Sequence, residues 1–283
     1  MAGVIKNLSA PARPFFTVSS GRSGTAMLHK ALSSLPDVEM HHEYMVHHTQ
    51  PLAVRRYMGL IGAEEARIDL AETYGAAVRY CQKTHWGDSS NKASWLIGDL
   101  FALFPNAKFV HLVRDGRKVA GSYFNKLADE CYDDRSTEIL RAHIEDEAPA
   151  PPPEKKYWWP LPRADAPGVK EFARFDQFER IAWHWSEINR VILNDLVALP
   201  REQTLFVKLE DLRQREESLK TLFAFLGLPY RDEMFAMFQR PHNVNRPEDK
   251  PLSDEQRARF TKIAGAMMEQ LGYGAEPEYV VKY

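Results

Sequence analysis

Hydrophobic positions along the chain change between two spacings, and the change predicts strands that lead directly into helices. The short apolar run at residues 15–18 is followed by Ser19-Ser20-Gly21, which is typical of a buried strand ending in a turn. From Thr25, apolar residues recur at helical spacing until Pro36 interrupts the pattern. We therefore expect a strand, a glycine loop and a helix in direct succession.

A second unit of this kind follows later in the chain. Residues 108–113 form an apolar run typical of a strand buried on both faces, and a helical pattern continues through Leu127. Further strands are predicted at residues 78–83 and 204–207, and helices at residues 95–104, 181–199, 219–226 and 256–271. This alternation predicts an α/β fold with a central, mostly parallel sheet flanked by helices on both faces.

The domain organisation follows from where the regular patterns begin and break. We interpret residues 1–13 as a flexible arm and residues 14–283 as a single domain, which suits a chain of 283 residues. Seven of the 18 prolines lie between Pro149 and Pro167, so we expect an insertion or lid at about residues 129–169 that governs acceptor choice. Trp158 and Trp159 in this segment either bind the acceptor or pin the loop down.

Composition and charge exclude several classes of protein. With 37 basic and 39 acidic residues the net charge is −2, which argues against a nucleic-acid partner. Two cysteines, Cys81 and Cys131, make neither a disulfide framework nor a CxxC pair, so we expect a cytoplasmic protein. No apolar run approaches the roughly 20 residues of a membrane span. The oligomeric state stays open.

The glycine loop at residues 19–25 favours anion binding. Where a strand feeds a helix, backbone N–H groups and the helix dipole point at a common anion. A nucleoside-triphosphate loop would continue after its last glycine with lysine and a hydroxyl residue, but Gly24 is followed by Thr25 and Ala26. Magnesium-dependent kinase chemistry is therefore disfavoured. The positive charge lies instead on Arg22, whose guanidinium can grip two oxygens of a phosphate or sulfate.

Two motifs together resemble the sulfotransferases that use 3′-phosphoadenosine 5′-phosphosulfate (PAPS), in particular bacterial members with a P-loop-like fold. Ser20-Gly21-Arg22-Ser23-Gly24-Thr25 is similar to their 5′-phosphosulfate loop. Arg114 at a predicted strand end, with Ser122 eight residues later on a predicted helix, is similar to the pair that holds the 3′-phosphate of the donor. The resemblance runs from about residue 15 to residue 273, apart from the insertion, and implies that the donor is bound by Gly21, Arg22, Ser23, Gly24, Thr25, Ala26, Arg114 and Ser122.

The resemblance offers two alternatives for the catalytic base. Glu43 resembles the catalytic glutamate of Golgi-type and several bacterial sulfotransferases. His85, in Lys83-Thr84-His85, matches the motif of the cytosolic branch, whose histidine is the base. The two compete for one role, and in either case Lys83 is expected to polarise the transferred group.

Two further groups of residues complete the candidates. Asn245 and Arg246 are expected in a late loop that closes over the nucleotide, as the family often uses a basic loop there. His41, His42, His47 and His48 form two adjacent pairs, a spacing unlike that of ordinary zinc motifs, so no metal is expected.

The sequence thus predicts an enzyme that moves a sulfuryl group from PAPS to a hydroxyl or amine of a small-molecule acceptor and releases adenosine 3′,5′-bisphosphate (PAP). The alternatives are a P-loop-type kinase acting on a small molecule and a non-catalytic nucleotide-binding protein. Neither the acceptor nor the choice between O- and N-sulfation follows from the fold and donor motifs.

Overall fold

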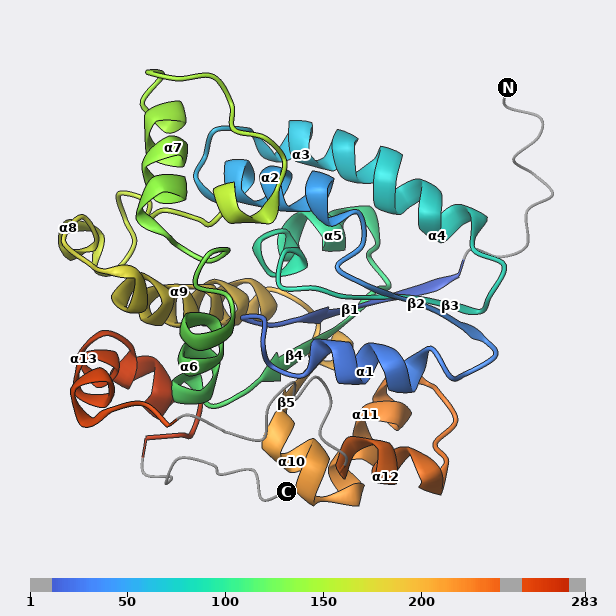
Figure 1. Cartoon of the computed structure of the whole chain (residues 1–283). Helices are drawn as coiled ribbons and strands as arrows, with labels where there is room; N and C mark the ends of the chain where they lie inside the picture. Colours follow the sequence, from blue (N-terminus) through green and yellow to red (C-terminus); the bar gives the residue numbers. More distant parts are fainter. Residues whose placement is uncertain (1–11, 240–250, 275–283) are drawn as a thin grey trace.

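A five-stranded sheet of parallel strands forms the centre of the computed structural model, which describes residues 12–239 and 251–274. The strands lie in the order β2-β3-β1-β4-β5 (Figure 1). Their bounds are Arg13–Val18 for β1, Val38–His42 for β2, His85–Ser89 for β3, Lys108–Val113 for β4 and Thr204–Lys208 for β5. The predicted α/β fold is confirmed.

Helices cover both faces of this sheet (Figure 1). One face packs against α1 (Thr25–Leu32), α10 (Leu209–Gln214), α11 (Glu216–Leu226) and α12 (Asp232–Gln239). The other packs against α2 (Val46–Tyr57), α3 (Ala63–Leu70), η2 (Ala71–Gly75), α4 (Ala76–Tyr80), η3 (Ala93–Trp95), α5 (Ile97–Leu103) and α9 (Gln177–Val197). A third group, α6 (Gly116–Lys126) and α13 (Asp254–Gln270), packs on α9, and η5 (Arg201–Gln203) precedes β5.

The strand sequences explain the two-sided packing. Successive side chains of a strand point to opposite faces, and Phe15 and Phe16 of β1 accordingly join different hydrophobic clusters. Phe16 meets Trp86 and Phe109 from the neighbouring strands, whereas Phe15 joins Val110 and the residues of α1. Strands buried on both faces read as continuous apolar runs, which is why β1 and β4 were predictable.

The strand predicted at residues 78–83 is wrong. Residues 78–80 of this segment belong to α4, which ends at Tyr80, and β3 begins only at His85. β3 reads HWGDS and carries a fully buried Asp88, whose carboxylate accepts hydrogen bonds from the Tyr44 N–H at 3.1 Å and the Tyr74 hydroxyl at 3.0 Å. A strand with such polar positions does not show an apolar pattern, and β2, which reads VEMHH, was missed for the same reason.

The segment at about residues 129–169 is folded into the molecule. It contains α7 (Asp134–Ile144) and η4 (Lys155–Tyr157) and leads into α8 (Val169–Phe172). Trp158 and Trp159 are buried, and their indole N–H groups donate to the carbonyls of Pro152 at 2.8 Å and Glu130 at 2.6 Å. Of the two roles considered for these tryptophans, the contacts fit the one that pins the segment down.

Residues 1–11 of the expected arm lie outside the described residues, and Arg13 already belongs to β1. The division into an arm and a single domain stays a prediction. Within residues 12–239 and 251–274, no helix combines the length and the apolar content needed to cross a membrane.

Candidate active site

The polar residues that follow the strands meet at one edge of the sheet. Because the strands are parallel, their carboxyl ends lie together, and ligands of open α/β sheets bind at this edge. β1 ends in the glycine loop, β2 in Glu43 and β4 in Arg114, and Lys92 follows β3 after a short turn. The segments expected to bind the donor and to act as base are thus gathered in one place.

Backbone conformation and close packing fix the glycine loop. Gly21, Arg22 and Gly24 have φ angles of 77°, 55° and 93°, and Gly24 caps the start of α1. A Cβ atom on Gly21 would lie 2.1 Å from the Tyr123 hydroxyl oxygen, which itself donates to the Ser20 carbonyl at 3.0 Å. Gly21 therefore has no room for a side chain, and the first turn of α1 leaves N–H groups without an intrahelical acceptor.

The glycine loop contacts the second predicted motif. Arg22 Nε donates to Ser122 Oγ at 2.9 Å, across 100 residues of sequence. Arg114 Nη1 donates to the Arg22 carbonyl at 3.0 Å. The two motifs that the sequence assigned to opposite ends of one donor molecule are therefore neighbours in the fold, with two guanidinium groups between them.

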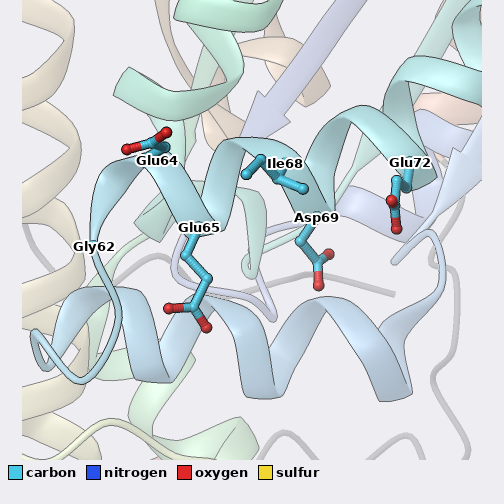
Figure 2. A pocket seen from close by; sticks show the side chains of 6 residues that line it. All are labelled: Gly62, Glu64, Glu65, Ile68, Asp69 and Glu72. Carbon is cyan, nitrogen blue, oxygen red and sulfur yellow. The ribbon is translucent and has the colours of Figure 1, made fainter.

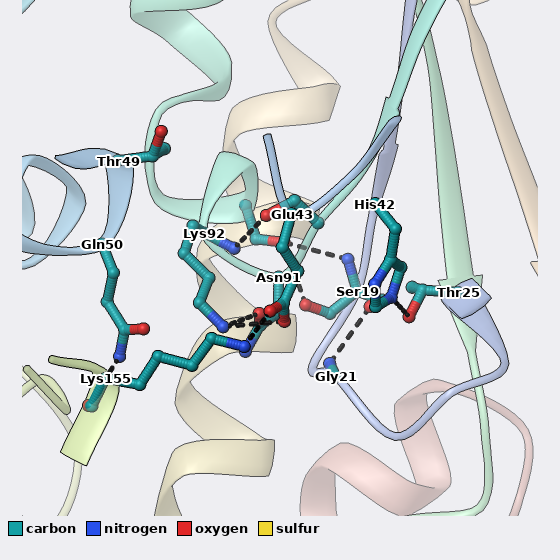
Figure 3. A network of polar contacts seen from close by, with 12 residues as sticks. Ser19, Gly21, Thr25, His42, Glu43, Thr49, Gln50, Asn91, Lys92 and Lys155 are labelled. Atoms are coloured by element: carbon teal, nitrogen blue, oxygen red, sulfur yellow. Dashed lines mark hydrogen bonds and ion pairs between the residues drawn. The ribbon is translucent and has the colours of Figure 1, made fainter. Parts of the chain in front are cut away.

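Glu43 lies on the other side of the loop, in a turn with φ of 58°. Its Oε1 accepts from Lys92 Nζ at 2.9 Å, and its Oε2 forms an ion pair with Lys155 Nζ from η4 (Figure 3). His42, the preceding residue, hydrogen bonds to Thr25 Oγ1 through Nε2 at 3.1 Å, which ties this turn to the start of α1.

The electrostatics of Glu43 follow from burial and from these two cations. Burial alone would raise the pKa of Glu43, but the ammonium groups of Lys92 and Lys155 outweigh it and lower the pKa to about 2. Burial lowers the pKa of Lys92, and Glu43 opposes this effect. Burial likewise lowers the pKa of His42. In this arrangement Glu43 is a carboxylate at neutral pH.

His85 and Lys83 are not part of this site. His85 is the first residue of β3 and pairs with Arg13 and Val38, which also begin their strands. It therefore lies at the amino edge of the sheet, roughly 13 Å of strand away from the edge that carries the glycine loop. This position argues against the predicted roles of His85 as base and Lys83 as polarising cation, which stay predictions.

Lys92 and Lys155 are the charged residues that the sequence patterns did not reveal. Lys83 was expected because of the resemblance of Lys83-Thr84-His85 to the motif of the cytosolic branch, whereas the end of β3 at Ser89 brings Lys92 to the carboxyl edge. The run Ser89-Ser90-Asn91, a cluster of turn-forming residues before Lys92, was the available signal. Lys155 lies 112 positions from Glu43, and no local pattern indicates their contact.

The four clustered histidines point to different partners. His41 pairs with Glu39, His42 with Thr25, His47 with the Pro153 carbonyl and His48 with Asp69. Among the described residues there is no group of three potential metal ligands. Asn245 and Arg246, expected in the late loop, lie outside the described residues.

A hollow of about 550 Å³ opens elsewhere, along α3, and its lining is largely acidic (Figure 2). Glu65 there pairs with Arg55, and Asp69 pairs with His48. No residue predicted for the donor or for the base lines it. An acidic lining repels phosphate and sulfate groups, so the carboxyl edge of the sheet is the better candidate for an anion site.

Comparisons with known proteins agree with this arrangement. Residues 14–151 match the profile of a sulfotransferase family. A sulfotransferase from Alicyclobacillus acidocaldarius shares the fold with a TM-score of 0.53 and 16% identity, over 92% of this chain and 94% of that one. A sulfotransferase from Mycobacterium avium gives a TM-score of 0.50 and 14% identity, over 93% of this chain and 77% of that one.

A comparison with curated protein sequences finds no match. The profile match covers the glycine loop, Glu43, Lys92, Arg114 and Ser122, all of which the fold brings to one edge of the sheet. On this basis residues 14–151 resemble the sulfotransferase family, and the chain has the fold of known sulfotransferases.

Proposed function

We propose that this protein transfers a sulfuryl group from PAPS to a hydroxyl or amine of a small-molecule acceptor and releases PAP. The observation that carries the proposal is the hydrogen bond from Arg22 to Ser122 at 2.9 Å. It joins the loop expected to bind the 5′-phosphosulfate to the motif expected to bind the 3′-phosphate. A donor with anionic groups at both of these positions has complementary charges in Arg22 and Arg114.

The residues present fit such a donor. The glycine loop excludes side chains at Gly21 and Gly24, where a Cβ atom would lie 2.1 Å from Tyr123 and 2.6 Å from Leu209. Backbone N–H groups at the start of α1 are therefore the donors that this loop presents to an anion. Arg114 and Ser122 would hold the 3′-phosphate, and Arg22 together with the loop would hold the 5′-phosphosulfate.

The chain's own residues supply a proton acceptor and positive charge. When bound, PAPS supplies the sulfuryl group. Glu43 Oε1 or Oε2 accepts the proton of the acceptor hydroxyl or amine, and the glycine loop aligns the two reactants. Lys92, rather than Lys83, places positive charge beside the transferred group, because it is the lysine at the carboxyl edge.

The alternatives make different demands on the same loop. A kinase of the P-loop class requires a lysine and a hydroxyl residue after Gly24, and the chain has Thr25 and Ala26 there. A non-catalytic nucleotide-binding protein would need no base, and this alternative assigns no role to the buried ion pair of Lys92 and Glu43.

Two measurements on the full chain test the proposal. Calorimetric titration should show binding of PAP, and no comparable binding of ATP with magnesium. Incubation with PAPS and a panel of phenols, alcohols and amines should then give a sulfated product detectable by mass spectrometry. Binding of ATP with magnesium but not of PAP would favour a kinase, and PAP binding without any product would favour the non-catalytic protein.

A further inference from the structure

Both oxygens of the Glu43 carboxylate are engaged by lysines, one oxygen by each lysine (Figure 3). Lys92 reaches Oε1 from the turn after β3, and Lys155 reaches Oε2 from η4. An acceptor hydroxyl or amine has to hydrogen bond to one of these oxygens before it can pass its proton. Each oxygen can accept more than one hydrogen bond, but an ammonium group beside each of them lowers the basicity of Glu43, so proton transfer is favoured when one of the two lysines moves aside.

Lys92 is held firmly in place. Its side chain is 5% exposed, and Nζ also donates to Asn91 Oδ1 at 2.6 Å. The ammonium group lies 5.9 Å from the centre of the Trp159 ring. Moving it would leave a buried charge without its carboxylate, which is a costly change.

Apart from its ion pair with Glu43, Lys155 is held by contacts of its backbone. Its carbonyl accepts a hydrogen bond from Gln50 Nε2 of α2 at 3.1 Å, and the same nitrogen donates to the Trp158 carbonyl at 2.6 Å. Gln50 is buried, so η4 is anchored on α2. The Lys155 side chain itself is 36% exposed and can turn toward solvent while its backbone stays in place.

We propose that Lys155 is a positioning residue of the reaction: it holds the Glu43 carboxylate in an ion pair that opens when the acceptor arrives, and so couples the segment of residues 129–169 to the base. The proposal rests on the proposed role of Glu43. It assigns to this segment a direct electrostatic effect on the chemistry, in addition to its packing through Trp158 and Trp159.

The charges around Glu43 indicate that Lys155 lowers the pKa of this carboxylate separately from Lys92. Opposite charges within about 4–6 Å typically lower a carboxyl pKa by 1–3 units. Lys92 and Lys155 both lower the pKa of Glu43, and the other ionisable groups that face this carboxylate are His42, Asp88 and Tyr123. Removing Lys155 leaves Lys92 paired with Glu43, and it also removes the effect by which Lys155 lowers the pKa of Lys92 and of His42.

Lys155→Met is the test, with two readouts. A carbon-13 NMR titration of the Glu43 carboxyl should show its pKa raised by about one unit or more. A carboxylate with a higher pKa is a stronger base, so the single-turnover rate at neutral pH with saturating donor and acceptor should rise about threefold or more. The Kd of PAP should stay within about twofold of the unsubstituted protein, since Lys155 contacts neither phosphate motif.

Two variants serve as controls. Lys155→Arg keeps the positive charge and should leave both readouts unchanged. Lys156→Met removes the neighbouring lysine, which lies over the Tyr157 ring and not on Glu43, and should also have no effect. An unmoved Glu43 pKa in Lys155→Met, or a single-turnover rate that falls, would overturn the proposal, because Lys155 would then be peripheral or would itself contact the reacting groups.

The two proposals fail in different ways. If the unsubstituted protein neither binds PAP nor forms a sulfated product, the proposed function fails, while the NMR titration still decides whether Lys155 controls Glu43. If turnover is normal and Lys155→Met changes neither readout, the proposed function stands and only the role of Lys155 is lost.

Discussion

Glu43 shows how the surroundings of one residue set its chemistry. A partly buried glutamate usually has a raised pKa, but two ammonium groups reverse the balance here and lower the pKa to about 2. The carboxylate is thus fully charged near neutrality, so its weakness as a base comes from the lysines and not from protonation. Its strength in the reaction depends on how many of these cations remain beside it.

Glu43→Gln tests the base directly. Glutamine keeps the shape of the side chain and removes its basicity, so turnover of PAPS should fall by about 10² to 10⁴ while the Kd of PAP barely changes. Steady-state kinetics with calorimetry of PAP gives both numbers. His85→Asn is the control: at the amino edge of the sheet it should leave turnover near that of the unsubstituted protein, and a loss of activity there would return the role of base to His85.

Arg114→Ala tests the 3′-phosphate site. Arg114 is expected to contact only this phosphate, so its loss should weaken PAP binding by about 1.5 to 3 kcal/mol, roughly 10- to 150-fold. Binding of adenosine 5′-phosphosulfate, which has no 3′-phosphate, should weaken less, since Arg114 acts on the 5′-phosphosulfate loop only through its hydrogen bond to the Arg22 carbonyl. Arg215→Ala removes an exposed arginine paired within its own turn and should affect neither ligand. Equal losses for both ligands in Arg114→Ala would contradict the assignment.

At the scale of elements, the glycine loop and α1 act as one unit. Gly24 begins the helix in a left-handed conformation and packs against Leu209, the first residue of α10. Gly24 therefore sets the direction of α1. It also allows the loop after β1 to pack against the start of α10, which follows β5. A side chain at this position would collide with Leu209, so we expect it to displace the loop from the geometry proposed for anion binding.

Gly24→Ala tests whether the close approach to Leu209 matters in addition to the backbone strain that any alanine has at a positive φ. The new Cβ would lie 2.6 Å from a Leu209 methyl group, so we expect PAP affinity to fall by about tenfold or more, in addition to a destabilisation of about 1 kcal/mol. Gly59→Ala is the matched control, because Gly59 has a similar φ of 76° and a Cβ atom there would meet no other atom within 4 Å. It should lower stability alone. Chemical denaturation and calorimetry measure the two quantities.

The strands also differ in how clearly their sequences predict them. β1 and β4 are apolar on both faces and were placed correctly, whereas β2 and β3 contain His41, Asp88 and other polar residues. Asp88 is tolerated in the middle of the sheet only because Tyr44 and Tyr74 satisfy both of its oxygens. Periodicity cannot detect a strand whose polar residues are satisfied by distant partners.

At the scale of the whole molecule, buried carboxyls make stability depend on pH. Burial raises the pKa of Asp88 to about 6 and that of Asp195 to about 6. A carboxyl with a raised pKa in the folded state contributes stability below its unfolded pKa, near 4, and loses it as pH rises through 6. Glu43 has the opposite sign, because its lowered pKa gives stability that is lost only as pH falls from about 4.5 toward 2.

Asp88→Asn should remove the part of the pH dependence of the unfolding free energy that Asp88 causes. Asparagine can still accept from the Tyr44 N–H, and it removes the cost of burying a charge, so the free energy of unfolding at pH 8 should rise by about 2 kcal/mol relative to the unsubstituted protein. Below pH 4 the two proteins should be nearly equal. Urea denaturation at pH 4, 6 and 8 measures the difference, and a variant that is less stable at pH 8 would show that the hydrogen bonds outweigh the buried charge.

The sequence by itself determined the fold class, and it indicated the two motifs proposed to bind the donor and Glu43 as one of two candidate bases. These features are local: a glycine loop between a strand and a helix, and Arg114 with Ser122 one strand and helix further on, are readable from spacing alone. The choice between Glu43 and His85 is not local, since it depends on the edge of the sheet at which each residue lies, and a resemblance of Lys83-Thr84-His85 to a short motif does not report that edge.

Only the tertiary structure decided which charges surround the base. Lys92 reaches Glu43 because β2 and β3 are neighbours in a parallel sheet, and Lys155 reaches it because Gln50 anchors η4 on α2. Pairing of strands and docking of a distant segment are set by packing over the whole molecule, which leaves no periodic signal in the chain. The identity of a catalytic residue can thus be suggested by a motif, while its proton affinity is a property of the assembled fold.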